Sequence, residues 1–286
     1  MENLFGLPSW EQKNEEISIL REIAGKMGVV GTVGSWSDVQ SIVRRGQAER
    51  YFAIGDSFMT TYRSIPVILD IIGINHDTPT DTARPYSITV QFRDCLENVQ
   101  FDAPEPTNPD ANIKLYGNNN YMQSAIKQWL NSNETTFKWV SKSQYDVAPT
   151  SANYNGAGFL KLLDPELVSV IGAVNKQVAR NTITDGGGQD LFSDKIFLLS
   201  RTEVYAGVEG VTTGENPYAY YSALAGAPTT GALAGRIKLL NNSPRNWWLR
   251  SPNVGNSNNV RYVSLAGEVS NSARNSFGIS PACCII

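Results

Sequence analysis

The chain has few charged side chains, and their distribution excludes one class of partner. Charged residues make up 18% of the 286 residues, below the share of roughly a quarter that is usual in globular proteins. The formal net charge is −3, and the basic residues form no cluster beyond Arg44–Arg45. Nucleic-acid-binding domains carry a basic patch or stripe. We therefore expect no nucleic-acid partner.

Cysteine is also scarce, with Cys95, Cys283 and Cys284 as the three in the chain. An odd number without framework spacing argues against a disulfide-stapled secreted domain. Adjacent cysteines seldom bond to each other, because the geometry is strained. Cys283–Cys284 could be a redox or copper-binding thiol pair, but their apolar C-terminal surroundings favour buried, inert residues on a closing strand.

Long hydrophobic runs are missing. No stretch approaches the roughly 20 apolar residues that a membrane span needs, and the first residues lack the charged and apolar regions of a signal peptide. We expect synthesis in the cytoplasm without membrane insertion, which is compatible with later assembly into a virion or display on a cell surface. A chain of 286 residues is long enough for a sizeable core.

Catalytic motifs are not recognisable. His76, the single histidine, lies in the segment 75–79, which predicts a loop, and no other metal-ligand type is spaced near it. A Ser-His-Asp site would need a positioned histidine and a nucleophile elbow, which this sequence lacks. Residues 186–188 are three glycines without the Lys-Ser/Thr of a phosphate-binding loop. We interpret His76 as a surface loop residue and the glycines as a flexible loop.

Carboxylate pairs and calcium ligands are weaker candidates. Asp70 with Asp94, or Glu203 with Glu209, could form a catalytic pair, but nothing in the sequence brings them together. Glu215-Asn216-Pro217 contains the residue types of a calcium-dependent sugar site, since calcium prefers oxygen ligands. A tripeptide alone carries little specificity. We therefore expect a non-enzymatic protein without a cofactor, with structural calcium as the alternative.

The N-terminal residues 1–46 predict a helical lead-in. Ser9 and Gln12 have the spacing of a capping box, and an apolar face follows to Met27. This helix either docks on the main body or mediates assembly. A second short helix is predicted over 37–45, with Gly46 as its end.

Residues 47–286 predict one α+β domain. Strands are expected at 67–72 and 86–92 around a hairpin loop at 75–85, and at 195–199. Helices are expected at 124–131 and from Asp164, an N-cap followed by Pro165, to about Arg180. Long loops are expected at 102–114 and 206–235.

The C-terminal segment 246–286 alternates two kinds of sequence. Its ends are apolar, whereas its middle is rich in Asn and Ser, with no Lys and one acid, Glu268. Small amides, hydroxyls, Tyr and Arg are typical of recognition surfaces. Asn, Ser and Gly are also ordinary turn formers. The composition alone leaves a recognition surface and a set of polar β-turns equally open.

Several segments together resemble one protein family. The motifs are 42–46 with 51–56, 116–121 with 124–131, 194–200 with 203–205, Trp247–Pro252 (W-W-L-R-S-P), and Gly278–Ala282 (G-x-x-P-A). They resemble bacterial and phage proteins with a C-type-lectin-like fold, which include variable proteins of diversity-generating retroelements such as the phage major tropism determinant. The two C-terminal motifs are the most specific.

This resemblance implies a ligand- or receptor-binding protein whose segment of about 246–277 is rewritten by a reverse transcriptase at adenines. Mutating the first two bases of an Asn codon cannot give Trp or Glu, so Trp247, Trp248 and Glu268 are expected to be invariant. The candidate ligand-binding and variable residues are Asn246, Asn253, Asn256, Asn258, Asn259, Arg261, Tyr262, Ser264, Asn271, Ser272, Arg274, Asn275 and Phe277. The candidate scaffold residues are Trp247, Trp248, Arg250, Pro252, Gly278 and Pro281.

The resemblance further implies a cell-surface protein or glycan of a host bacterium as ligand, a phage-tail location and a homo-oligomer such as a trimer. Two alternatives stay open. One is a fixed carbohydrate-binding or adhesin module of the same fold. The other is an enzyme related to formylglycine-generating proteins, which would need reactive thiols.

Overall fold

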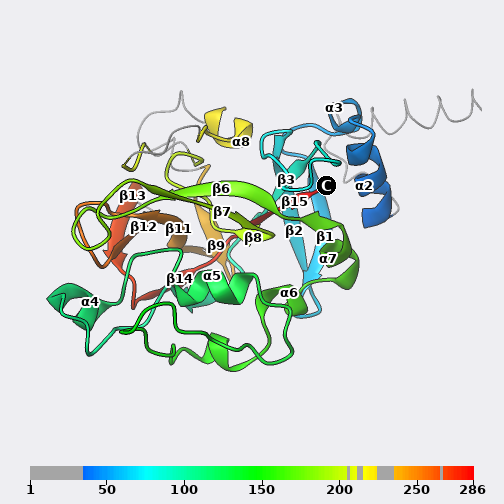
Figure 1. Cartoon of the computed structure of the whole chain (residues 1–286). Helices are drawn as coiled ribbons and strands as arrows, with labels where there is room; N and C mark the ends of the chain where they lie inside the picture. Colours follow the sequence, from blue (N-terminus) through cyan, green and yellow to red (C-terminus); the bar gives the residue numbers. More distant parts are fainter. Residues whose placement is uncertain (1–34, 205–206, 211–214, 224–234, 265–266) are drawn as a thin grey trace, which may run out of the picture.

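The computed structural model describes residues 35–204, 207–210, 215–223, 235–264 and 267–286. Two main sheets lie on opposite sides of the molecule, and a two-stranded hairpin, β6–β7, runs between them (Figure 1). The six-stranded sheet has the order β1-β2-β3-β15-β5, with β8 also paired to β15. The five-stranded sheet has the order β13-β12-β11-β14-β4. Most pairs are antiparallel; β11 and β14 are parallel.

The strands are mostly short. Their bounds are β1 Ser57–Tyr62, β2 Ile65–Ile74, β3 Ile88–Phe92, β4 Asn98–Gln100, β5 Ile171–Gly172, β6 Val174–Ala179, β7 Gln189–Asp194, β8 Ile196–Phe197, β9 Lys238–Leu240, β10 Ser243–Arg245, β11 Trp247–Pro252, β12 Asn259–Ser264, β13 Gly267–Ser272, β14 Ser276–Gly278 and β15 Ala282–Ile285.

The helices are short and are capped by their own sequence. Their bounds are α2 Trp36–Arg44, α3 Ala48–Tyr51, α4 Ala111–Tyr116, α5 Ala125–Leu130, the 3-10 helix η1 Ala152–Asn155, α6 Phe159–Leu162, α7 Pro165–Val170 and α8 Ala219–Ser222. Side chains of Ser35, Asp110, Ser124 and Asp164 accept hydrogen bonds from the first turns of α2, α4, α5 and α7. Such caps satisfy backbone donors that the helix itself leaves free.

Two hydrophobic clusters lie on either side of the central strands, because side chains alternate across a strand. In β15, Cys283 and Ile285 belong to the larger cluster, whereas Ala282 and Cys284 belong to the smaller one. The adjacent tryptophans of β11 divide in the same way, with Trp248 in the larger cluster and Trp247 in the smaller. The Trp-Trp pair therefore joins two cores through one strand.

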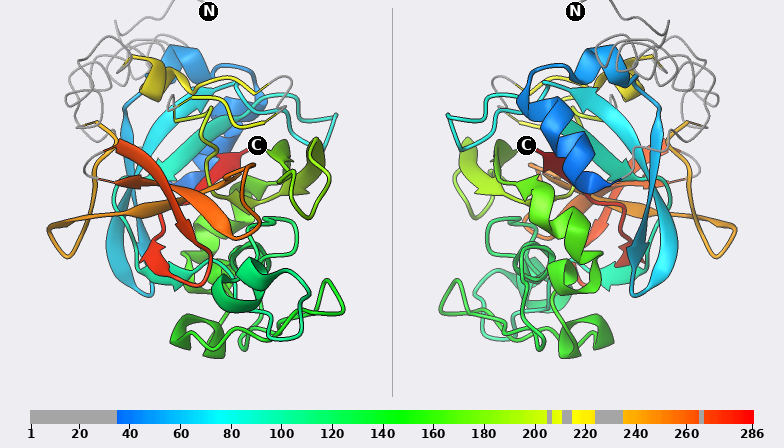
Figure 2. Two further views of the ribbon diagram at one scale, coloured as in Figure 1. Left: turned by 90° about the vertical axis from the view of Figure 1, so that its left-hand side faces the viewer. Right: turned by 90° about the vertical axis from the view of Figure 1, so that its right-hand side faces the viewer.

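Helix α2 packs beside the end of the chain, as Figure 2 shows in its right-hand view. Its buried residues Trp36, Val39, Ile42 and Val43 belong to the larger cluster. Gln40 donates a hydrogen bond of 2.8 Å to the Ile286 carbonyl. Ile286 lies directly over Gly172, where an added Cβ would stand 1.8 Å from its side chain. Only glycine fits at that crossing.

The structure confirms the α+β class and several predicted elements. Helix 37–45 is α2, helix 124–131 is α5, and the strands 67–72 and 86–92 pair as β2 and β3. Cys283 and Cys284 are fully buried on the closing strand, as predicted.

The helix predicted from Asp164 to about Arg180 is wrong in its second half. It ends at Val170, and the chain continues as β5 and β6. Residues 170, 174 and 178 fit the period of a helix, but the stretch is rich in β-branched residues, which favour strands. Strand β15 also offers a free edge, and β5 pairs with it. The tertiary partner therefore decided the local structure.

Three smaller differences concern loops and termini. The loop predicted at 102–114 contains the start of α4, the strand predicted at 195–199 is limited to β8, and the loop predicted at 206–235 contains α8. The predicted helix with Ser9 and Met27 lies outside the described residues.

Truncating Trp248 tests the role of β11 in joining the cores. Trp248 is fully buried, contacts the Phe277 ring at 4.5 Å and donates a hydrogen bond of 2.9 Å to the Val99 carbonyl. We expect Trp248→Ala to lower the free energy of unfolding by roughly 3–5 kcal/mol. Urea denaturation would measure it. Met59→Ala, at a residue that is 64% exposed, is the control, and equal losses in the two variants would contradict the expectation.

Candidate functional site

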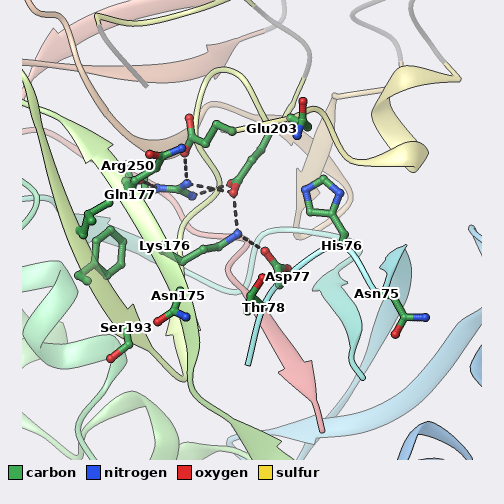
Figure 3. Close-up of a pocket in the computed structure, with 14 residues that line it drawn as sticks. Asn75, His76, Asp77, Thr78, Asn175, Lys176, Gln177, Ser193, Glu203 and Arg250 are labelled. Carbon is green, nitrogen blue, oxygen red and sulfur yellow. Dashed lines mark hydrogen bonds and ion pairs between the residues drawn. The ribbon is translucent and has the colours of Figure 1, made fainter. Parts of the chain in front are cut away.

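An open cleft of about 800 Å³ lies where four parts of the chain meet. Its walls come from the loop after β2, the paired strands β6 and β7, the segment around Glu203 and Glu215, and Arg250 of β11 (Figure 3). The loop is held against β6 by a bridge between Pro79 and Val174. Six of the fourteen lining residues have amide or hydroxyl side chains, namely Asn75, Thr78, Asn175, Gln177, Ser193 and Asn216.

A buried lysine forms the centre of the cleft floor. Lys176 Nζ contacts Asp77 Oδ1 at 2.5 Å, Glu203 Oε1 at 2.6 Å and the Tyr218 hydroxyl at 2.9 Å. Burial alone would lower the pKa of Lys176, but the carboxylates of Asp77 and Glu203 outweigh it and raise the pKa. The ammonium therefore stays charged, and an ammonium has three donors. All three are used.

A buried arginine stands beside this lysine. Arg250 binds both carboxylate oxygens of Glu203, at 2.6 and 2.9 Å, and also pairs with Glu215. Its remaining donors go to the carbonyls of Gln177 and Leu198, at 2.9 and 2.8 Å. Burial would raise the pKa of Glu203, yet Arg250 and then Lys176 lower it. The floor is thus an ionised, hydrogen-bonded network.

Asp77 links this network to the smaller hydrophobic cluster. Its Oδ2 accepts hydrogen bonds from Thr89 at 2.5 Å and from the Tyr218 hydroxyl at 2.7 Å, and the Cys284 thiol lies 3.4 Å away. Burial raises the pKa of Cys284 well above its ordinary value, and raises that of Cys283 to about 12. Both thiols therefore stay protonated near neutral pH.

His76 lies at the rim of the cleft. It is in the loop that the sequence predicts, but it is half-buried, and its ring packs on Tyr218 with 4.1 Å between ring centroids. Burial lowers the pKa of His76, so the imidazole is neutral at pH 7. No group of three or more His, Cys, Asp or Glu residues that could hold a metal ion occurs in the described part of the chain.

The carboxylates considered from the sequence do not form the suggested pairs. Asp70 pairs with Arg93 at 2.6 Å, and Asp94 accepts a hydrogen bond from the Leu239 amide. Glu203 belongs to the cleft, whereas Glu209 pairs with Arg201 at 2.9 Å and with Arg261 at 2.7 Å. Glu215 and Asn216 of the suggested calcium tripeptide line the cleft, where Arg250 is the ionic partner of Glu215.

Burial separates the two sets of residues predicted in the C-terminal segment. The scaffold residues Trp247, Trp248, Arg250, Pro252, Gly278 and Pro281 are all buried. The candidate variable residues are half-buried or exposed, namely Asn246, Asn253, Asn256, Asn259, Arg261, Tyr262, Ser264, Asn271, Ser272, Arg274, Asn275 and Phe277. Asn258 differs, with 7% exposure, and its side chain donates to Asn259.

The candidate variable residues do not share one face. Neighbours in a strand point to opposite sides of the sheet, and on β12 this separates Arg261 from Tyr262. Tyr262 lies with Phe277 against Trp248, at ring distances of 4.6 Å and 6.0 Å. Arg261 instead forms the ion pair with Glu209. The sequence contains this alternation, but the strand at 259–264 was not predicted.

The cleft was missed as a unit, although some of its members stand out in the sequence. The sequence indicates a surface loop for His76, a calcium tripeptide for Glu215 and a scaffold position for Arg250. Lys176 lies in the stretch that was predicted as a helix, so its strand neighbours could not be inferred. The sole sequence signal for the network is a set of isolated charges inside apolar strands, since such charges are seldom buried without partners.

The site thus belongs to an α+β domain with a polar cleft over a buried ionic floor. Residues 93–286 match the family described as Domain of unknown function (DUF6273), and the chain belongs to this family. No curated protein and no solved structure matches the chain. In the described residues, no helix has the length and apolar character needed to cross a membrane.

Removing the central lysine tests whether the floor is a single ionic unit. Lys176→Met would leave Asp77 and part of Glu203 without their buried cation. We expect the free energy of unfolding at pH 7 to fall by roughly 3–5 kcal/mol, the usual cost of removing one partner of a buried pair. Lys138→Met, at an exposed lysine, should change it by about 0.5 kcal/mol at most. Similar losses in both variants would contradict this role.

The same variant predicts a pH dependence. The folded-state pKa values of Asp77 and Glu203 are lowered, so their stabilisation is present above the ordinary carboxyl pKa of about 4 and is lost as the pH falls below it. A protonated Asp77 no longer requires a cation. The stability difference between wild type and Lys176→Met should therefore shrink from pH 7 to pH 3 in urea titrations. A difference that is constant with pH would indicate lost packing instead.

Proposed function

We propose that this chain is a non-enzymatic ligand-binding protein with a C-type-lectin-like fold, whose C-terminal segment is diversified by a retroelement. The observation that carries the proposal is the burial pattern of residues 246–281. The scaffold residues Trp247, Trp248, Arg250, Pro252, Gly278 and Pro281 are buried, and the residues expected to vary, except Asn258, are half-buried or exposed. A diversified segment needs this separation, because substitutions at buried sites destabilise a protein far more than substitutions at its surface.

The arrangement of the strands supports the fold assignment. The last strand, β15, pairs with β3 in the middle of the six-stranded sheet. In the second sheet, β11 is the motif Trp247–Pro252, and the motif Gly278–Ala282 runs from the end of β14 to the start of β15. The segment that would vary is therefore anchored at both ends by strands of the core. Changes at the polar positions between these anchors would leave the two hydrophobic clusters intact, whereas Tyr262 and Phe277 pack against the larger cluster.

The contact surface centres on an aromatic pair. Tyr262 and Phe277 are half-buried and pack on the fully buried Trp248. Asn271 and Asn275 lie nearby in sequence and are joined by a side-chain hydrogen bond of 2.8 Å. Aromatic residues dominate the energetics of interfaces, and amides around them adapt to different ligands. Arg261 has a different role, because Glu209 holds it on the opposite face.

Among the alternatives, the thiol enzyme receives the least support. A thiolate is the reactive form of cysteine, and burial raises the pKa of Cys95 and Cys283 to about 12. A fixed adhesin of the same fold would use the same surface, and differs from the proposal in having an invariant segment. The proposed ligand is a protein or glycan on a bacterial host, with the chain in a phage tail or at a cell surface as a homo-oligomer.

Sequencing the gene and its flanks across the source population tests the proposal. We expect substitutions to concentrate at the half-buried and exposed positions between 246 and 277, with Trp247, Trp248 and Arg250 unchanged. A near-copy of the segment and a reverse transcriptase gene should lie nearby. The buried Asn258 should vary less than Asn275. An invariant segment without a second copy would overturn diversification and favour the fixed adhesin.

A further inference from the structure

One carboxylate oxygen in the cleft, Oε2 of Glu215, has no hydrogen-bond partner in the described part of the chain. Arg250 donates to Oε1 of Glu215, but Oε2 is buried and has no hydrogen-bond partner among the described residues. The Glu215 side chain is 5% exposed. A buried carboxylate oxygen without a donor is costly, because it has given up its hydration. This oxygen lies in a residue that lines the cleft.

The two cations of the floor cannot satisfy it. Lys176 uses its three donors on Asp77, Glu203 and Tyr218. Arg250 has five N–H donors, and five contacts occupy them, to Gln177, Leu198, twice to Glu203 and once to Glu215. The Ser200 side chain also hydrogen-bonds to Glu215 and opposes the rise in its pKa that burial causes, yet Oε2 still has no partner among the described residues. A ligand in the cleft could supply the further donor.

The charge balance points to the kind of donor. Three carboxylates, Asp77, Glu203 and Glu215, face two cations, Lys176 and Arg250. His76 on the rim adds no charge at neutral pH, since burial lowers its pKa. An anionic ligand would meet an excess of negative charge and cations without free donors. A cationic ligand group would balance the third carboxylate and donate to its free oxygen.

We propose that the cleft binds a polar ligand that carries a primary ammonium group, which pairs with Glu215. The amide and hydroxyl side chains of the walls suit a ligand with several hydroxyl groups beside the amine, because amides both donate and accept hydrogen bonds. The volume of about 800 Å³ lies within the range of small-molecule sites. This inference uses residues outside the 246–277 surface except Arg250, and does not rest on diversification.

Titration calorimetry with matched sugars tests the proposal. D-glucosamine carries the ammonium, whereas N-acetyl-D-glucosamine and D-glucose present the hydroxyls without the charge. At pH 7 we expect glucosamine to bind at least about tenfold more tightly than either neutral sugar, the ratio that corresponds to about 1.4 kcal/mol. Equal affinity for the three sugars, or no binding by glucosamine, would overturn the proposal. Tighter binding of a neutral sugar would also contradict the proposal and would indicate that the cleft binds uncharged polyols.

The variant Glu215→Gln keeps the shape and removes the charge. It should abolish the preference for glucosamine, whereas Glu134→Gln, at an exposed glutamate, should retain it. A Glu215→Gln protein that still prefers glucosamine would overturn the role of Glu215. Thermal melting would show whether both variants fold.

A pH series on the wild-type protein keeps the test independent of folding. Burial raises the pKa of Glu215, with Glu203 adding to the effect and Arg250 opposing it. A protonated Glu215 cannot pair with an ammonium. Glucosamine affinity should therefore fall as the pH is lowered through that pKa, while the affinity of glucose should change little. Glucosamine binding that does not depend on pH over the range where the protein stays folded would overturn the ion pair.

Discussion

The carboxylate of Glu203 is the point on which the middle of the molecule depends. It accepts hydrogen bonds from Lys176 of β6 and Arg250 of β11, and through Lys176 it reaches Asp77 in the loop after β2. Segments far apart in the chain are thereby fixed at one place. Buried ion pairs often add little net stability compared with apolar side chains, but losing one partner is expensive. The network therefore restricts which arrangement of the strands is tolerated, because a displaced strand would leave a buried charge unpaired.

Packing of β11 in both hydrophobic clusters also fixes the position of this strand. Trp247 and Trp248 enter different clusters, and their indole N–H groups donate to the carbonyls of Arg236 and Val99, both at 2.9 Å. Two residues further along β11, Arg250 reaches the ionic floor. One strand thus carries the contacts of two cores and one side of the cleft. A shift of β11 by a single residue would exchange the clusters and remove Arg250 from Glu203.

Features that depend on a few neighbouring residues could be predicted from the sequence. The cap of α7 and the burial of Cys283 follow from short stretches of sequence. Strand β3 also forms where a strand is expected, but it is buried on both faces. The second half of the helix predicted from Asp164 is wrong because its apolar spacing also fits a strand, and pairing of β5 with β15 and of β6 with β7 determined which structure formed. The same error concealed the cleft, since Lys176 reaches Asp77 and Glu203 from strand β6, which the sequence predicts as a helix. Contacts between residues 99 and 27 positions apart leave no trace in local periodicity.

The C-terminal segment contains both residues of the proposed variable surface and Arg250 of the cleft floor. These positions differ in how well they tolerate substitution. Arg250 is bound to Glu203 and Glu215 and has no free donor, so a substitution there would leave the buried Glu215 without its ion-pair partner and Glu203 with Lys176 alone. Arg261, eleven positions later, is half-buried and pairs with Glu209, which also has Arg201 as a partner. Loss of Arg261 would therefore leave Glu209 with one cation. The two arginines thus differ in how much change their positions tolerate, because Glu215 would lose its ion-pair partner whereas Glu209 would keep Arg201.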